Sequence, residues 1–201
     1  MSNNLWEEAE KFLSKDKYIG PLIKKYGPCS IRKRPKEEYF IDLVESIVSQ
    51  QLSVKAASTI FERLSTRFKG KITPESVLRV RNETLRACGL SNAKVEYTKD
   101  LARRVKEKVL EIEKLDKLSE EEVKRELIAV KGIGNWTAEM FLMFTLAKKD
   151  IFPVDDLGIR NGMEKLIGKE LDTDGMAKFV ERWAPYRTVA SWYVWAILDN
   201  K

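Results

Sequence analysis

The feature that most constrains the fold is a helical repeat of apolar residues that runs through most of the chain. In the segment 36–50 the apolar side chains recur every three or four positions, and the members of this stripe are Phe40, Leu43, Val44, Ile47 and Val48. That spacing places them on one face of a helix. Alternating apolar and polar runs between turns, which are typical of strands, are nearly absent. The sequence therefore predicts an all-α fold of roughly ten helices.

Capping residues mark several expected helix ends. Thr73 before Pro74 is typical of a helix start, and Ser119 with Glu122 forms a capping-box pattern. The apolar spacing predicts a long helix that runs to about residue 110. Later helices are predicted at residues 135–147, 157–167, 175–183 and 187–199. No Pro- or Gly-rich linker indicates a domain boundary. The length of 201 residues suits one domain or two small lobes that share a groove.

Composition excludes several kinds of catalytic site. The chain has no histidine, which removes Ser-His-Asp triads, Cys-His dyads and nearly all zinc sites with imidazole ligands. Its two cysteines, Cys29 and Cys88, cannot form a four-cysteine zinc or iron–sulfur site, and we expect them to be buried. Any catalysis must use carboxylates, lysines or hydroxyls.

Net charge is +6 with a pI near 9.2, which is typical of chains that bind nucleic acid. A solvated surface rich in Lys and Glu explains the same charge, so this signal leaves both interpretations open. No apolar run approaches the roughly 20 residues of a membrane helix. The acidic, polar start of the chain is unlike a secretory signal, so we expect an intracellular protein in the cytoplasm, nucleoid or nucleus.

The segment 127–147 carries the first functional signal. An amphipathic helix is expected to end near Val130, and a second helix begins at about Asn135 after the turn Lys131-Gly132-Ile133-Gly134. The two glycines permit a tight turn and a close backbone approach, and the apolar side chain between them can fill the gap between the helices. Outward N–H groups in such a turn can bind a phosphate. An ordinary helix-turn-helix corner with a glycine cap remains the alternative.

A candidate catalytic carboxylate follows in the segment IFPVDDLGIR. Asp155 and Asp156 lie at the start of an expected helix, where aspartate is also a favoured N-cap. Hydrolysis of an N-glycosidic bond develops a cation on the sugar, which a fixed carboxylate stabilises. The same group can orient or deprotonate the attacking water.

The pattern apolar-x-x-apolar-x-G-I-G-x-x-T-A, with the Pro-x-Asp-Asp segment after it, resembles the helix-hairpin-helix superfamily of DNA repair glycosylases. The match spans roughly residues 36–199 in the expected order. The resemblance implies two helical lobes, with the active site in the groove between them. One lobe would hold residues 36–147, including the hairpin at 127–147, and the other residues 1–35 plus 148–201.

The resemblance also implies roles for individual residues. Asp156 maps to the catalytic carboxylate, while Asp155 would be a cap or a supporting hydrogen-bond acceptor. The residues that map to DNA backbone contacts are Lys131, Gly132, Ile133, Gly134 and Thr137. The main-chain carbonyls that map to a monovalent cation site are those of Ile128, Val130 and Ile133. No other cofactor is expected.

Position 136 separates branches of the superfamily. Members that also cleave the strand carry a lysine there, whereas this chain has Trp136, which cannot form a Schiff base. The sequence therefore predicts a monofunctional enzyme that uses water and leaves an abasic site. Trp136 and Trp195 are the candidate base-pocket residues, because electron-rich rings attract cationic alkylated purines.

The segment SIVSQQLS maps to the wedge that fills the duplex when a base flips out. Gln51 is the matching residue and Leu52 the second candidate, although polar residues here could simply cap adjacent helices. The stretch CGLSNAK, residues 88–94, resembles the family's G-L-S-x-x-K pattern, with an architectural role.

The overall pattern is similar to the alkylation-repair branch, 3-methyladenine DNA glycosylase II, in a compact form without that branch's additional N-terminal domain. We expect a monomer that acts on damaged double-stranded DNA and excises bases such as 3-methyladenine and 7-methylguanine, with no membrane partner and no iron–sulfur cluster. A glycosylase for oxidised or deaminated bases and a non-catalytic DNA-binding module are the alternatives. The carboxylate at position 156 argues against the module, because it would repel phosphates.

Overall fold

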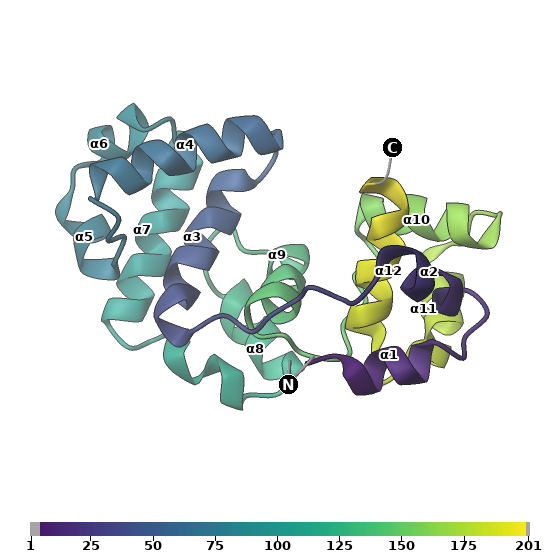
Figure 1. The fold of residues 1–201 in the computed structure, drawn as a ribbon. Helices are drawn as coiled ribbons and strands as arrows, with labels where there is room; N and C mark the ends of the chain where they lie inside the picture. Colours follow the sequence, from purple (N-terminus) through teal and green to yellow (C-terminus); the bar gives the residue numbers. More distant parts are fainter. Residues whose placement is uncertain (1–4, 200–201) are drawn as a thin grey trace. The chain divides into compact units, whose positions relative to one another are not determined.

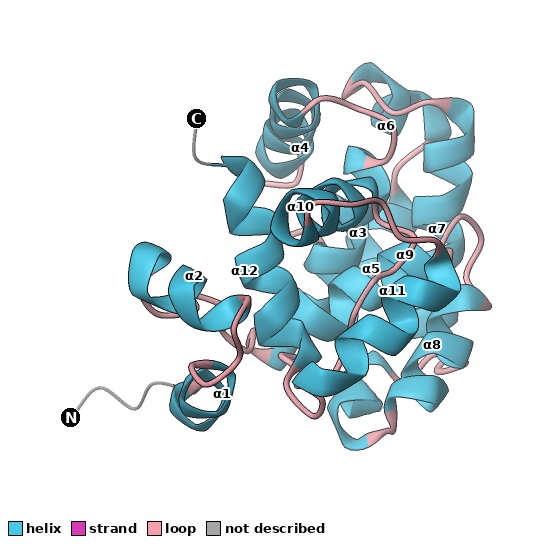
Figure 2. Cartoon of the chain, turned by 90° about the vertical axis from the view of Figure 1, so that its right-hand side faces the viewer, coloured by secondary structure: helices cyan, strands magenta, loops and turns pink. Residues whose placement is uncertain are grey.

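A computed structural model describes residues 5–199 of the chain, and the regular elements among these residues are all helical (Figure 2). The expectation of an all-α protein is confirmed. The chain divides into two compact units, one formed by residues 34–141 and the other by residues 1–33 and 142–201. The sequence analysis placed these boundaries at 36 and 147.

The unit of residues 34–141 is built on the packing of α7 against α5 and α3 (Figure 1). Helix α3 also packs on α4, and α8 packs on α9. The elements of this unit are η1 (Lys36–Glu38), α3 (Tyr39–Ser49), α4 (Val54–Arg67), α5 (Pro74–Arg79), α6 (Asn82–Ala87), α7 (Asn92–Lys106), η2 (Ile112–Lys117), α8 (Glu120–Ile128) and α9 (Asn135–Met140).

Local sequence signals explain where these helices begin. Hydroxyl side chains at four N-cap positions accept hydrogen bonds from main-chain N–H groups of the first turns, and these residues are Ser53, Thr73, Ser91 and Ser119. The capping box expected at Ser119 and Glu122 is present. The apolar stripe of α3 is buried along its whole length, as its spacing predicts.

The other unit contains α1 (Glu7–Leu13), α2 (Ile19–Tyr26), α10 (Leu157–Ile167), α11 (Thr173–Val180), η4 (Glu181–Trp183) and α12 (Arg187–Asp199). Helix α12 lies at its centre and packs against α10, α2 and α1 (Figure 1). The core includes the fully buried side chains of Trp6, Leu13, Trp183 and Tyr193. Two polar groups of this core donate to main-chain carbonyls: the Trp6 indole N–H to Ile31 and the Tyr193 hydroxyl to Gly27, each at 2.8 Å.

Close approach of α10 to α12 depends on two glycines one helical turn apart. A Cβ at Gly162 would lie 2.6 Å from the carbonyl oxygen of Val194, inside van der Waals contact. A Cβ at Gly158 would lie 2.9 Å from the indole nitrogen of Trp195. Small residues at both positions therefore let the two helices pack tightly beside residue 156.

Three predicted helix ends differ from the structure. The long helix α7 ends at Lys106 because Lys108 turns into a left-handed conformation with φ 58°. The helix expected at 135–147 is α9 followed by a π-helical turn, η3 (Phe141–Thr145). The helix expected from residue 175 begins at Thr173, because the Asp172 carboxylate caps it by accepting the Gly175 N–H at 2.8 Å. Among the described residues, no helix has the length and apolar character to cross a membrane.

Candidate active site

Asp156 lies at the N-terminus of α10 and is held there by two hydrogen bonds. Its Oδ1 atom accepts the main-chain N–H of Ile159 at 2.7 Å, which makes it the N-cap of the helix. The same oxygen accepts the indole N–H of Trp195 at 2.9 Å. The main-chain N–H of Asp156 donates to the carbonyl of Pro153 at 3.0 Å. These contacts fix the carboxylate while leaving it only partly buried.

Of the two roles expected for Asp155, a cap or a supporting hydrogen-bond acceptor, the structure assigns the cap of this helix to Asp156. Asp155 is exposed and precedes the cap, whereas Asp156 has the extended backbone of an N-cap, with φ −72° and ψ 126°. The residue proposed for catalysis is therefore also the residue that begins the helix. Its position relative to α10 is fixed by the backbone and not by side-chain packing alone.

An aromatic pair borders the Asp156 carboxylate. The ring centroids of Trp195 and Phe144 are 5.7 Å apart with planes tilted by 36°. Phe144 is 39% exposed, so an apolar surface lies beside the hydrogen-bonded indole. A Cβ at Gly158 would lie 3.0 Å from the Asp156 Oδ1 atom, so only glycine leaves the carboxylate and the indole in contact there.

The segment that leads to Asp156 is anchored on the start of α12. Arg187 forms a bidentate pair with Asp150, in which both nitrogen–oxygen distances are 2.7 Å. The Thr188 hydroxyl donates to the Lys148 carbonyl at 2.7 Å and accepts the Ile151 N–H at 3.0 Å. Because α12 also carries Trp195, the segment and the indole are fixed to the same helix.

The hairpin between α8 and α9 has the turn that the sequence predicts. Gly132 has φ 78°, a left-handed conformation that favours glycine, and a Cβ there would lie 2.1 Å from the Tyr97 ring. Ile133 is buried, in agreement with its expected place between the helices. A Cβ at Gly134 would meet nothing within 4 Å, so the backbone there faces open space.

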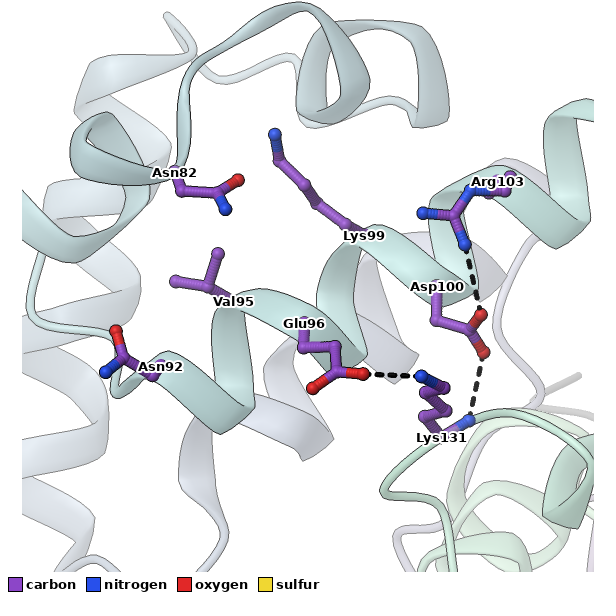
Figure 3. A pocket seen from close by; sticks show the side chains of 8 residues that line it. All are labelled: Asn82, Asn92, Val95, Glu96, Lys99, Asp100, Arg103 and Lys131. Carbon is purple, nitrogen blue, oxygen red and sulfur yellow. Dashed lines mark hydrogen bonds and ion pairs between the residues drawn. The ribbon is translucent and has the colours of Figure 1, made fainter.

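A carboxylate on α7 holds the hairpin turn in place (Figure 3). The buried Asp100 accepts the main-chain N–H of Lys131 at 3.1 Å and the Nε–H of Arg104 at 2.9 Å, and Arg103 pairs with it from the exposed side. Burial alone would raise the pKa of Asp100, but the Lys131 N–H and the Arg104 guanidinium outweigh it and hold the pKa below its ordinary value. Asp100 is therefore charged at neutral pH.

The side chain of Lys131 points to Glu96 on α7, and the two groups form an exposed ion pair (Figure 3). The hydrogen bond that Lys131 donates to the Glu96 carboxylate raises the pKa of Lys131. A hollow of about 450 Å³ lies beside this pair. Its lining residues are Asn82, Asn92, Val95, Glu96, Lys99, Asp100, Arg103 and Lys131. Contact of Lys131 with a phosphate, which stays a prediction, would have to compete with Glu96.

Two other hairpin residues lie in different environments. Trp136 is 43% exposed in the first turn of α9, so its ring is available to a ligand. The side chain of Thr137 is buried, with 4% exposed, and the expected DNA backbone contact at this residue stays a prediction. Trp136 belongs to the unit of residues 34–141, and Asp156 and Trp195 belong to the other unit. A base pocket shared by Trp136 and Trp195 stays a prediction.

The expected wedge lies in the turn between α3 and α4. Gln51 is exposed and has φ 56°, and Leu52 is 38% exposed. Ser53 caps α4, so Gln51 is not its cap. Gln50 donates from Nε2 to the carbonyl of Gly132 at 2.8 Å, so its side chain bonds to the hairpin turn. Gln51 is thus the outward residue of the pair.

The donor set for the expected cation consists of main-chain carbonyls. The Val130 carbonyl accepts the Ile133 N–H at 3.1 Å, and its second lone pair can still face an ion. Within the described residues, no group of three or more His, Cys, Asp or Glu side chains could hold a metal ion. Neutral oxygen donors suit a hard monovalent cation, so the residues present fit such an ion.

Comparison with known proteins places this geometry in a family. Residues 44–185 match the family model of the HhH-GPD superfamily base excision DNA repair protein. The chain belongs to the HhH-GPD superfamily. A curated HhH-GPD relative, DNA-3-methyladenine glycosylase 1 of Schizosaccharomyces pombe, is 38% identical over 89% of this chain and 80% of its own length. The alkylbase DNA glycosidase-like protein mag2 of the same yeast is 33% identical over 96% of this chain and 93% of its own length.

The solved structures give the same result for this HhH-GPD chain. The 3-methyladenine DNA glycosylase of Schizosaccharomyces pombe in complex with abasic DNA superposes with a TM-score of 0.85 at 37% identity, covering 96% of this chain and 97% of that one. The DNA-3-methyladenine glycosidase of Bacillus halodurans also has a TM-score of 0.85, at 35% identity, and covers 96% and 90% of the two chains.

Sequence reasoning missed four residues that shape this HhH-GPD site. Gly158 could have been found, because a glycine inside a helix is unfavourable and therefore indicates a close contact with a neighbouring group. Phe144 was concealed within an apolar run, where core packing explains any aromatic. Lys94 entered the sequence analysis only as the lysine of the G-L-S-x-x-K stretch, without its contacts, and Asp100 did not enter it. Both act through main-chain atoms of distant turns, which no spacing in the sequence indicates.

Proposed function

We propose that this HhH-GPD chain is a monofunctional DNA glycosylase that excises alkylated bases such as 3-methyladenine and 7-methylguanine from double-stranded DNA and leaves an abasic site. The observation that carries the proposal is the carboxylate of Asp156, which the indole of Trp195 and the N-terminus of α10 hold in place. The names of the two relatives from Schizosaccharomyces pombe support the substrate class.

The proposed chemistry begins with binding of the DNA backbone. The main-chain N–H groups of Gly132 and Gly134 would face a phosphate, with little dependence on base sequence, because those of Lys131 and Ile133 already donate to Asp100 and to the Val130 carbonyl. Gln51 enters the base stack as the damaged nucleotide swings out. A cation at the carbonyls of Ile128, Val130 and Ile133 would supply additional positive charge beside the phosphate. The hairpin and the wedge therefore position the lesion, and neither touches the bond that breaks.

Cleavage itself falls to Asp156. As the bond between the sugar and the base lengthens, positive charge grows on the sugar and the fixed carboxylate stabilises it. The same group orients the water that attacks the sugar carbon and accepts its proton, while the electrons of the breaking bond leave with the base. An alkylated purine already carries positive charge, so it leaves as a neutral base and requires no strong general acid. Trp136 and Trp195 are the proposed stacking residues for that charged base.

The absence of a lysine at position 136 supports hydrolysis without strand cleavage. Tryptophan offers no amine for a covalent intermediate with the sugar, so water is the proposed nucleophile. The enzyme would act as an intracellular monomer, and it would need no cofactor beyond the hairpin cation.

Release of the base from methylated duplex DNA by wild type and Asp156→Asn tests the proposal. We expect wild type to release 3-methyladenine, the variant to lose on the order of 10²-fold or more in rate, and nicks to appear only after alkali. Because asparagine also caps helices well, the variant should unfold at nearly the same temperature, which separates catalysis from folding.

Three other outcomes would contradict parts of the proposal. Nicks without alkali would refute the monofunctional reaction. Release of oxidised or deaminated bases instead would change the substrate class. DNA binding without any base release would indicate a non-catalytic binding module.

A further inference from the structure

Lys94 makes two hydrogen bonds that the proposed chemistry does not require. Its ammonium group, at the start of α7, donates to the main-chain carbonyls of Val48 and Gln50, each at 2.7 Å. These carbonyls lie at the C-terminal end of α3, where a helix carries partial negative charge. Burial lowers the pKa of Lys94, because the charged ammonium group loses contact with water there. An apolar side chain of similar length would fill the same space without that desolvation cost. Packing alone therefore does not explain why a lysine bonds to these two carbonyls.

The Gln50 carbonyl immediately precedes Gln51, the exposed residue of the wedge turn, and the Val48 carbonyl lies in the last turn of α3. Gln51 has φ 56°, a left-handed conformation that is unfavourable for a residue with a side chain and that persists only where its surroundings hold it. Lys94 fixes the main chain on the N-terminal side of Gln51, and the capped start of α4 at Ser53 fixes the other side. The turn is therefore held from both sides while the Gln51 side chain stays exposed.

The same helix also holds the hairpin. Lys94, Tyr97 and Asp100 are spaced by three residues on α7, and the last two contact the hairpin turn at Gly132 and at the Lys131 N–H. The side chain of Gln50 joins the two turns directly through the Gly132 carbonyl. The wedge turn and the phosphate-binding turn are thus fixed to one helix and to each other.

We propose that Lys94 is a positioning residue for base flipping: it holds the wedge turn in register with the hairpin, so that Gln51 enters the stack at a set distance from the bound phosphate. This inference rests on the proposed function. Lys94 itself contacts neither the base nor the sugar. Its loss should slow the extrusion of a paired base and should leave bond cleavage in an extruded nucleotide nearly unchanged.

Two substrates separate these steps. In a fully paired duplex, a flipped nucleotide costs a base pair and its stacking, and the wedge offsets that cost. In a single-nucleotide bulge the same lesion has no pair to break, so the wedge matters less. The ratio of single-turnover release rates on the duplex and on the bulge therefore measures the wedge. A general loss of folded protein or of catalytic power leaves that ratio unchanged.

Lys99→Met is the matched control for Lys94→Met. Lys99 lies on the same helix and donates in the same way to a main-chain carbonyl at a helix end, that of Val80 at 2.8 Å, but it does not touch the wedge turn. With 7-methylguanine as the lesion and enzyme in excess, we expect Lys94→Met to lower the duplex rate on the order of 10- to 100-fold and the bulge rate less than about threefold. Lys99→Met should leave the ratio at the wild-type value.

Equal ratios for the two variants would overturn the inference. If wild type released no base from either substrate, the proposed function would fail instead, so the two failures are distinguishable. If Lys94→Met did not fold, Gln50→Met would replace it, because Gln50 is partly exposed and its hydrogen bond to Gly132 is the second link in the same register. A wild-type ratio in a folded Gln50→Met would also contradict the proposed coupling.

Discussion

Gly158→Ala tests whether the contact between Trp195 and Asp156 sets the rate of catalysis. The new methyl carbon would lie 2.9 Å from the indole nitrogen and 3.0 Å from both the Asp156 Oδ1 atom and the indole Cδ1 atom. Ordinary contacts begin near 3.5 Å, so the ring and the carboxylate must each move away from the methyl carbon by about 0.5 Å. The hydrogen bond of 2.9 Å between them cannot survive this change intact.

The expected size of the effect follows from that displacement. A misplacement of about 1 Å at a reacting group can cost on the order of 10²-fold in rate, so about half that distance should lower the rate roughly tenfold. Alanine raises helix stability by up to about 1 kcal/mol over glycine, which offsets part of the strain. We therefore expect a change in unfolding free energy within about 1 kcal/mol together with a clear loss of rate.

Single-turnover release of 7-methylguanine, measured beside thermal unfolding, is the assay. Asn161→Ala is the control, because Asn161 is exposed on the same helix and its replacement changes helix propensity without a steric clash. Affinity for duplex containing an abasic site should not change in either variant, since the hairpin is untouched. A wild-type rate in a folded Gly158→Ala would refute the idea that this hydrogen bond positions the carboxylate.

Other predictions concern the hairpin and its supports. Gly132→Ala should destabilise the protein by about 2 kcal/mol or more in denaturant unfolding, because a left-handed backbone and a ring clash combine, whereas Gly134→Ala should keep full stability and weaken DNA binding. Equal stability losses would contradict this assignment. Asp100→Asn should make the free energy of unfolding less dependent on pH in acid. The lowered pKa of Asp100 contributes stability above pH about 4, and wild type loses it as pH falls through the folded-state pKa; unfolding free energies that fall equally with pH in the two proteins would refute this. Glu96→Gln should free Lys131 and tighten DNA binding severalfold at low salt, with the gain fading as salt rises; unchanged affinity would show that the lysine does not reach phosphate.

The sequence predicted the helices and the hairpin well because their signals are local. The stripe of α3, the capping box at Ser119 and the glycine turn each depend on residues within a few positions of one another. Such patterns act through backbone geometry that a single segment determines. The π-helical turn after α9 was missed, because an apolar run such as FLMFT reads equally well as an ordinary helix.

The site was predicted less completely, since its supports cross long stretches of sequence. Asp156 was singled out as the catalytic residue, but its second role as the helix cap was not predicted, because two adjacent aspartates have equal capping preference. The burial of the Thr137 side chain was not predicted from its place in the motif, because it depends on the packing of α9 in the folded unit. Neither outcome can be read from one segment alone.

The lysines of α7 change how the charge of this chain should be interpreted. Lys94 and Lys99 both direct their ammonium groups at main-chain carbonyls, and Lys36 pairs with Asp116. Ions that condense on DNA are released only by protein charges that reach its phosphates, and each such contact contributes a slope of about −0.9 to log affinity against log salt. A titration against salt therefore counts the phosphates in contact, and that count should fall well below the number of basic residues in the sequence.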